Sequence, residues 1–133
     1  MTSVEIRNLV AGETVACGRD VTLADIASLM ISEDVGSVAV VDGSTLLGIV
    51  TERDMVRAIA AGADTEVSTA REWMTVDPDV ADPDLSVEDA ARWMLTAGYR
   101  HLPVVEGTRL MGVVSIKDVL WALDGVLAFG DSG

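Results

Sequence analysis

The sequence has very little of the side-chain chemistry that builds most catalytic or metal centres. Among its 133 residues there is one cysteine, Cys17, and one histidine, His101. A single cysteine excludes an internal disulfide and any paired-cysteine metal motif. A single histidine argues against a multi-histidine metal centre and against a catalytic relay through histidine. We therefore expect no enzyme activity, no metal site and no obligatory cofactor.

Aromatic residues and positive charges are also scarce. Three Trp, one Tyr and one Phe leave the core to aliphatic side chains. The formal charge is −13, with 22 acidic residues against nine Lys and Arg, so the surface should repel the phosphates of nucleic acids and membranes. The first ten residues carry charges where a signal peptide would be apolar, and no run reaches transmembrane length. These features predict a cytoplasmic protein.

The most informative feature that the sequence does contain is an internal repeat. The stretch "LLGIVTERDMV" at residues 46–56 returns as "LMGVVSIKDVL" at residues 110–120, an offset of 64. Residues 20–59 and 84–123 align without a gap and are identical at 12 of 40 positions. Unrelated segments of this composition would match at about three positions. One structural unit is therefore used twice.

Each copy has the pattern strand, helix, strand, strand, helix, which indicates an α/β (α+β) fold. The amphipathic helices begin at the capping residues Thr22 and Ser86, and the second helices run from Thr51 and Ser115 to about Ala60 and Leu123. We expect strands at residues 14–17, 37–41, 46–50, 79–82, 101–105 and 109–114. The predicted organisation is a first repeat at 1–61, a connecting segment at 62–72, a second repeat at 73–123 and a loose C-terminal tail at 124–133.

This order of elements, the two Gly-x-x-Ser/Thr-x-x-Asp endings and the stretch "RHLPVVEG" together resemble the CBS domain, named after cystathionine β-synthase. The resemblance covers residues 3–123 and is to a stand-alone pair of such domains, a Bateman module. It implies a pseudo-two-fold pair with two clefts that bind adenine nucleotides, S-adenosylmethionine or NAD. It also implies a homodimer formed through the helices.

The Ser/Thr-x-x-Asp pattern itself has two interpretations. It is the capping box of an ordinary helix, and capping explains the copies that begin at Thr22 and Ser86. The copies that begin at Thr51 and Ser115 each follow a buried strand directly, where the free N–H groups of a helix attract anions. There the carboxylate could accept hydrogen bonds from ribose hydroxyls. Gly48 in the preceding strand marks either a bulge or the close approach of a ligand.

The resemblance also groups the candidate site residues into two clefts of different strength. More cations surround the Thr51 motif, because Gly36 and Ser37 occupy the positions that Arg100 and His101 have in the other copy. Charge-assisted contacts are about twice as strong as neutral ones. The stronger cleft would use Ile49, Thr51, Arg53, Asp54, Val80, Arg100, His101, Leu102, Pro103 and Lys117. The weaker cleft would use Ala16, Gly36, Ser37, Val38, Val113, Ser115 and Asp118.

Several of these patterns keep a plainer alternative. Arg100 and His101 could be solvent-facing residues at a strand entry, and the three tryptophans could pack in the core or form a dimer seam. The acidic stretch at residues 77–84 indicates a solvated linker rather than a divalent cation site. The sequence thus predicts a regulatory module that binds AMP, ADP or ATP, with Mg²⁺ if the ligand is ATP, and acts on a protein target. The alternatives are a scaffold with empty clefts or a binder of S-adenosylmethionine or NAD.

Overall fold

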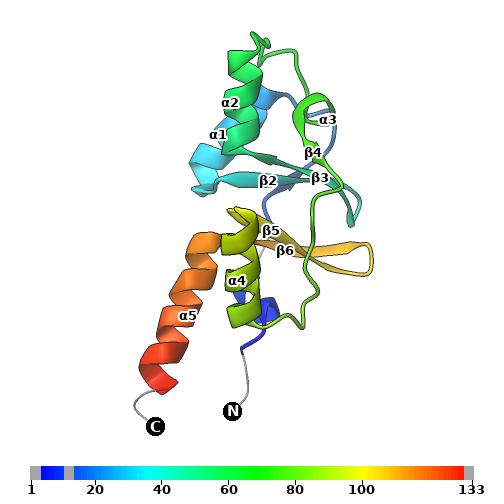
Figure 1. Cartoon of the computed structure of the whole chain (residues 1–133). Coiled ribbons are helices and arrows are strands. Elements are labelled where there is room, and N and C mark those ends of the chain that lie inside the picture. The colour runs from blue at the N-terminus through cyan, green and yellow to red at the C-terminus, as the bar shows by residue number, and fades with distance from the viewer. Residues whose placement is uncertain (1–3, 11–13, 131–133) are drawn as a thin grey trace. The chain divides into compact units, whose positions relative to one another are not determined.

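The fold is known from a computed structural model that describes residues 4–10 and 14–130, with side chains up to residue 125. It is a mixed α+β structure (Figure 1). Its packing divides the described chain into two compact units of similar size. The first, residues 14–78, is called the Asp54 unit. The second joins residues 4–10 to residues 79–130 and is called the Asp118 unit.

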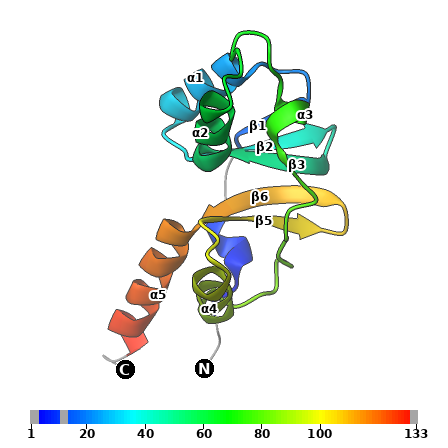
Figure 2. The same ribbon diagram turned by 45° about the horizontal axis from the view of Figure 1, so that its top comes forward.

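In the Asp54 unit two helices cover the same side of a small sheet, as Figure 2 shows. Strand β1 is parallel to β2, β2 is antiparallel to β3, and β3 is antiparallel to β4. The core between helices and strands is aliphatic and includes Leu23, Ile26, Val38, Val50 and Met55. In chain order the elements are β1 (Ala16–Cys17), α1 (Leu23–Glu33), β2 (Ser37–Asp42), β3 (Thr45–Thr51), α2 (Glu52–Ala60), α3 (Ala70–Trp73) and β4 (Thr75–Val76).

The Asp118 unit repeats this design around its own aliphatic core. Ala81 forms a parallel bridge with Val104, which corresponds to the β1–β2 pairing of the other unit. The helix α5 continues to Gly130, so the expected loose tail is wrong for residues 124–130, and residues 131–133 lie outside the described part. The elements are η1 (Ile6–Leu9), α4 (Val87–Ala97), β5 (His101–Glu106), β6 (Arg109–Ser115) and α5 (Ile116–Gly130).

The two hairpins confirm the strands that the repeat predicts. Val40 pairs with Gly48 and Val104 with Gly112, and in both hairpins the register shifts directly after that pair. The capping interpretation of the first helices is confirmed as well. The Thr22 hydroxyl accepts the backbone N–H of Asp25 at 3.3 Å, and the Ser86 hydroxyl accepts that of Asp89 at 3.1 Å.

Two short helical turns are exchanged between the repeats. The turn η1 lies at the start of the first repeat yet packs in the Asp118 unit, and α3 lies where the connecting segment meets the second repeat yet packs in the Asp54 unit. The contacts agree at the 64-residue offset: the Ile6 N–H donates to the Leu85 carbonyl, and the Ala70 N–H to that of Val21. An Arg7–Asp84 ion pair in one unit matches an Arg71–Asp20 pair in the other. The sequence repeats and the compact units therefore divide the chain differently.

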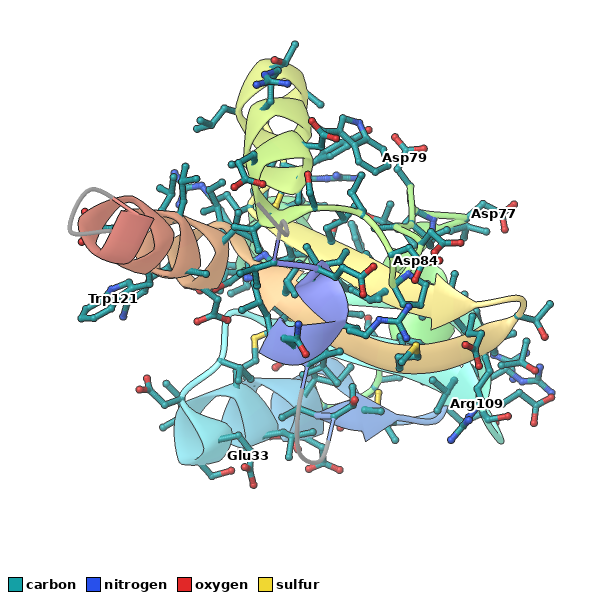
Figure 3. The ribbon with its side chains drawn as sticks, turned by 90° about the horizontal axis from the view of Figure 1, so that it is seen from below. Glu33, Asp77, Asp79, Asp84, Arg109 and Trp121 are labelled. Atoms are coloured by element: carbon teal, nitrogen blue, oxygen red, sulfur yellow. The ribbon has the colours of Figure 1, made fainter. Side chains whose placement is uncertain are left out.

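The tryptophans fall into two groups. Trp73 and Trp93 are partly buried against the cores of the two units, and the Trp93 ring meets Tyr99 edge to face with centroids 6.1 Å apart. Trp121 is 74% exposed on α5 and its ring points away from the helix (Figure 3). Core packing therefore explains the first two tryptophans but not Trp121.

Cys17 is only partly buried, and this burial raises the pKa of its thiol.

None of the helices in residues 4–10 and 14–130 combines the length and the apolar character needed to cross a membrane. Within the same ranges, His, Cys, Asp and Glu side chains form no cluster of three that could hold a metal ion.

Candidate functional site

The Thr51–Asp54 motif closes the first turn of α2 as a complete capping box. The Thr51 N–H donates to Oδ2 of Asp54 at 2.9 Å, and the Thr51 hydroxyl donates to the same oxygen at 3.0 Å. In return the Asp54 N–H donates to the Thr51 hydroxyl oxygen at 3.3 Å. The capping interpretation of this motif is confirmed. A ligand role for Asp54 therefore has to coexist with a structural one.

Asp54 is also held by two residues that sequence reasoning did not assign to the site. Asp54 itself is 2% exposed. The Thr75 hydroxyl, on β4, lies 3.3 Å from Oδ1 and 3.4 Å from Oδ2, and the Arg57 guanidinium lies 3.5 Å from Oδ1. Arg57 was detectable in the sequence, because residues three apart on a helix are neighbours. Thr75 carried no such signal, because β4 is too short to predict.

The equivalent motif in the Asp118 unit is more open. The Asp118 N–H donates to the Ser115 hydroxyl oxygen at 3.1 Å, which is one half of a capping box. The Asp118 side chain is exposed, unlike that of Asp54. At the 64-residue offset the position of Thr75 corresponds in the sequence to Ala11, a residue type without a hydroxyl. The two motifs therefore share a local sequence and differ in what surrounds the carboxylate.

Each motif lies beside the start of the neighbouring strand in its own unit. Ser37 pairs with Thr51, and the Glu52 N–H donates to the Gly36 carbonyl at 3.1 Å. In the second unit the same two positions are His101, paired with Ser115, and Arg100, whose carbonyl accepts the Ile116 N–H at 2.8 Å. The structure thus brings Gly36 and Ser37 to the Thr51 motif, and Arg100 and His101 to the Ser115 motif.

The remaining polar and half-exposed candidates lie around these two points. Arg53 on α2 is exposed, and so are Arg100 and Lys117 in the other unit. Val80 is 38% exposed and precedes Ala81, whose N–H donates to the Pro103 carbonyl at 2.8 Å. Ala16 of β1 pairs with Ala39, next to Val38. These positions correspond between the units, as the repeat predicts.

Two of the expected site residues, Val38 and Leu102, have side chains in the hydrophobic cores, and Ile49 is buried outside them. Val38 and Leu102 are 0% and 1% exposed, and Ile49 is 4% exposed. Pro103 is buried as well, whereas Val113 is partly buried. The sequence could not show that these side chains are buried, because a strand beside a site carries core residues and site residues in alternation.

Gly48 is explained by the strand that lies against it. A Cβ at this position would lie 2.6 Å from the Thr75 carbonyl oxygen and 2.8 Å from the Met74 sulfur. Any side chain would therefore push β4 away from β3. The bulge interpretation also holds, because the register shifts next to the Val40–Gly48 pair. Gly48 is needed for β4 to reach Asp54.

Comparison with known proteins agrees with the repeat. The family model described as the CBS domain matches the chain twice, over residues 6–61 and 70–125. An uncharacterised 17.7 kDa protein of Acidianus ambivalens is 40% identical over 106 residues, which are 78% of this chain. The chain spans 63% of the length of that relative.

Solved structures show the same fold. A CBS-domain containing protein from Agrobacterium tumefaciens is 31% identical, with a TM-score of 0.81 over 90% of this chain and 98% of that one. A CBS domain protein from Pyrobaculum aerophilum, solved with AMP, has a TM-score of 0.80 at 24% identity and covers 92% and 99% of the two chains. A CBS domain pair solved with 5-methylthioadenosine and S-adenosyl-L-methionine has a TM-score of 0.83 at 22% identity and covers 93% and 98%.

Proposed function

Because the chain belongs to the CBS domain family, we propose that it is a non-enzymatic regulatory module that binds an adenine nucleotide. Two proteins of the same fold have been solved with adenosine-containing compounds, which makes that class of ligand the first to test. At their identity to this chain the likeness concerns the fold. The proposal therefore depends on the residues of this chain.

The observation that carries the proposal is the repeated motif at a strand end. In both units a Ser/Thr and an Asp three residues later lie where a buried strand passes into a helix. Helix starts favour phosphate groups, because their backbone N–H groups are free and the helix dipole is positive there. A carboxylate one turn into the helix supplies acceptors for the two ribose hydroxyls. The pattern suits a nucleotide better than an uncharged ligand.

The positive side chains make one site the stronger candidate. We group Asp54 with Arg53, Arg100, His101 and Lys117, as the family resemblance implies, and expect the nucleotide phosphate to contact these groups. The protein carries a formal charge of −13, so few cations are available elsewhere to bind an anion. ATP would bring Mg²⁺ with it. Bound nucleotide would shift the protein between two conformations by its difference in affinity for them, and a protein target would respond to that shift.

Thermal unfolding with added nucleotide tests the proposal. Millimolar AMP or ATP should raise the melting temperature of the wild-type protein, because a ligand that binds only the folded state stabilises it. Asp54→Ala should remove most of that rise, and Asp118→Ala should leave most of it. Each rise is measured against the same variant without ligand, since Asp54→Ala also alters the helix cap.

Two further arms separate the rival functions. Arg100→Ala should reduce the rise, whereas Arg109→Ala, a control at an exposed arginine of β6, should not. A rise with S-adenosylmethionine or NAD but not with AMP or ATP would change the ligand and keep the regulatory function. Absence of a rise with any of the four compounds would favour a scaffold that binds no small molecule.

We also propose that the module forms a homodimer. Large apolar side chains are exposed at equivalent helix positions of the two repeats: Ile31 and Leu95 at 84% and 63%, Val56 and Leu120 at 65% and 41%. Isolated exposed residues are ordinary, but their recurrence on matching helices suits a two-fold interface. Sedimentation equilibrium should give twice the chain mass, and a monomer at every concentration would exclude this proposal.

A further inference from the structure

We propose that Thr75 is an internal competitor of the nucleotide at Asp54, and that ligand binding displaces it and releases β4. This inference rests on the proposed role of Asp54 in ribose binding. It concerns the regulation of that same site, and it follows from contacts within the Asp54 unit.

The two oxygens of Asp54 have different partners. Oδ2 is held by the Thr51 N–H and hydroxyl at 2.9 and 3.0 Å, as the helix cap requires. Oδ1 contacts the Thr75 hydroxyl at 3.3 Å and the Arg57 guanidinium at 3.5 Å. Oδ1 is therefore the oxygen that can change partner without loss of the cap. In the structure the Thr75 hydroxyl holds the place that a ribose hydroxyl would need.

The Thr75 contact is weak enough to be exchanged. Hydroxyl hydrogen bonds are usually about 2.5–3.0 Å long, so contacts of 3.3 and 3.4 Å are at the weak end. The strand β4 consists of two exposed residues, of which Val76 is 60% exposed, and within its unit it pairs with β3. Short segments with few buried contacts open at low cost. A ligand hydroxyl that forms a shorter bond with Oδ1 would displace Thr75.

Displacement of β4 would change the backbone conformation at the end of the Asp54 unit. The residue directly after β4 is Asp77, which has a φ of +48°. Residues other than glycine adopt this backbone conformation uncommonly. Such residues are held in place by their surroundings and store some backbone strain. Release of β4 would let Asp77 relax, one residue before Pro78, the last residue of the unit. Occupancy of Asp54 would thus alter the segment that leads into the Asp118 unit.

The competitor is specific to one of the two motifs. The residue that corresponds to Thr75 in the other repeat is Ala11, which has no hydroxyl to donate. Asp118 is exposed, whereas Asp54 is 2% exposed. The site to which we assign more cations would then be the one that is held closed, and its apparent affinity would be lower than its contacts alone would give.

Calorimetric titration with AMP tests the competition. Thr75→Val removes the hydroxyl and keeps the side-chain shape, so AMP should bind roughly two- to ten-fold more tightly, the equivalent of one hydrogen bond. Thr75→Ser keeps a hydroxyl and should retain the wild-type affinity. Thr108→Val, the same change at an exposed turn residue, should have no effect. Weaker or unchanged binding by Thr75→Val would overturn the inference.

Hydrogen exchange tests the release of β4 directly. In the wild-type protein, saturating AMP should speed the exchange of a peptide covering residues 73–78 and slow that of residues 49–55. Gly48→Ala should speed exchange of the first peptide without ligand, because the added Cβ forces β4 away. Slower exchange of residues 73–78 with AMP would overturn the inference and leave the proposed function intact. If neither AMP nor ATP binds the wild-type protein or the variants, the proposed nucleotide binding and this inference both fail.

Discussion

Asp54 and Asp118 occupy the same position of the same motif in two repeats, yet their carboxylates differ in nearly every contact. Asp54 is 2% exposed, accepts hydrogen bonds from Thr51 and Thr75, and pairs with Arg57. Asp118 is exposed, and its backbone N–H donates to the Ser115 hydroxyl. Identical spacing therefore fixes the helix start in both units but does not fix the availability of the carboxylate. Residues from outside the motif decide that.

The first prediction turns this comparison into a difference in stability. Asp54→Ala should lower the free energy of unfolding by about 1–3 kcal/mol, because buried donors lose their acceptor. Asp118→Ala should change it by less than about 0.5 kcal/mol, as surface substitutions usually do. Urea unfolding of both variants without ligand, at one protein concentration, measures the two values. Equal losses would mean that the two carboxylates contribute equally to the free energy of unfolding.

A second prediction concerns the residue that ends the first helix, which is an aspartate in one repeat and a glycine in the other. Both α1 and α4 end in a left-handed residue, Asp34 with a φ of +54° and Gly98 with a φ of +77°. Glycine adopts this conformation without steric cost. Gly98→Ala should therefore destabilise the protein by about 1 kcal/mol.

The reciprocal substitution is the matched control. Asp34→Gly should stabilise the protein by about 0.5 kcal/mol, since glycine relieves the left-handed strain at some cost in chain entropy. Thermal or urea unfolding of both variants measures the effect. If Asp34→Gly is destabilising, then the aspartate side chain contributes contacts that outweigh its backbone strain.

The third and smallest effect comes from a contact that only one unit contains. The Tyr99 phenol donates a hydrogen bond to Asp79, and this bond, with the nearby negative charge, raises the pKa of Tyr99 above its ordinary value. The equivalent residues of the other repeat are Val35 and Val15. The pKa is raised in the folded state, so the contact contributes its full stabilisation at a pH below the unfolded pKa of about 10. This stabilisation is lost as the pH rises through the folded pKa.

The substitution Tyr99→Phe measures this contact. The wild-type protein should unfold at a higher temperature than the variant at neutral pH, and the difference should shrink above about pH 10. Tyr99 is the sole tyrosine, so ultraviolet absorbance follows its ionisation without interference. A difference that stays constant through the ionisation would show that Asp79 does not distinguish the two forms of the phenol.

Much of the fold was accessible from the sequence because the repeat supplied two independent copies of every pattern. Helix starts at Thr22, Thr51 and Ser86 follow from local hydrogen bonding, and the hairpin strands follow from runs of β-branched residues. The end of α5 was placed too early, because Gly125 follows Leu123 closely and glycine often ends a helix, whereas α5 continues through it to Gly130. The short elements α3 and β4 were missed because four and two residues carry no periodic signal.

For the candidate site, the sequence predicted which residue types are present and how they are spaced, but it did not predict which residues surround them. It placed Thr51 and Asp54 at a strand end, but it did not find Thr75, which lies 21 residues away along the chain. It also counted Val38 and Leu102 among the site residues, whereas their side chains belong to the cores. A strand residue next to a site points to the core or to the ligand according to the pleat, and a one-residue bulge changes which.

The sequence by itself determined that this protein is one CBS unit used twice and where its main helices begin, and it singled out the two carboxylates that we propose for ribose binding. These properties depend on local spacing, capping and charge, which are encoded in contiguous residues. Only the tertiary structure decided that η1 and α3 are exchanged between the repeats, and that Asp54 is closed by Thr75 while Asp118 stays exposed. Those outcomes depend on contacts between distant segments, and the strength of such contacts is set by packing rather than by the motif.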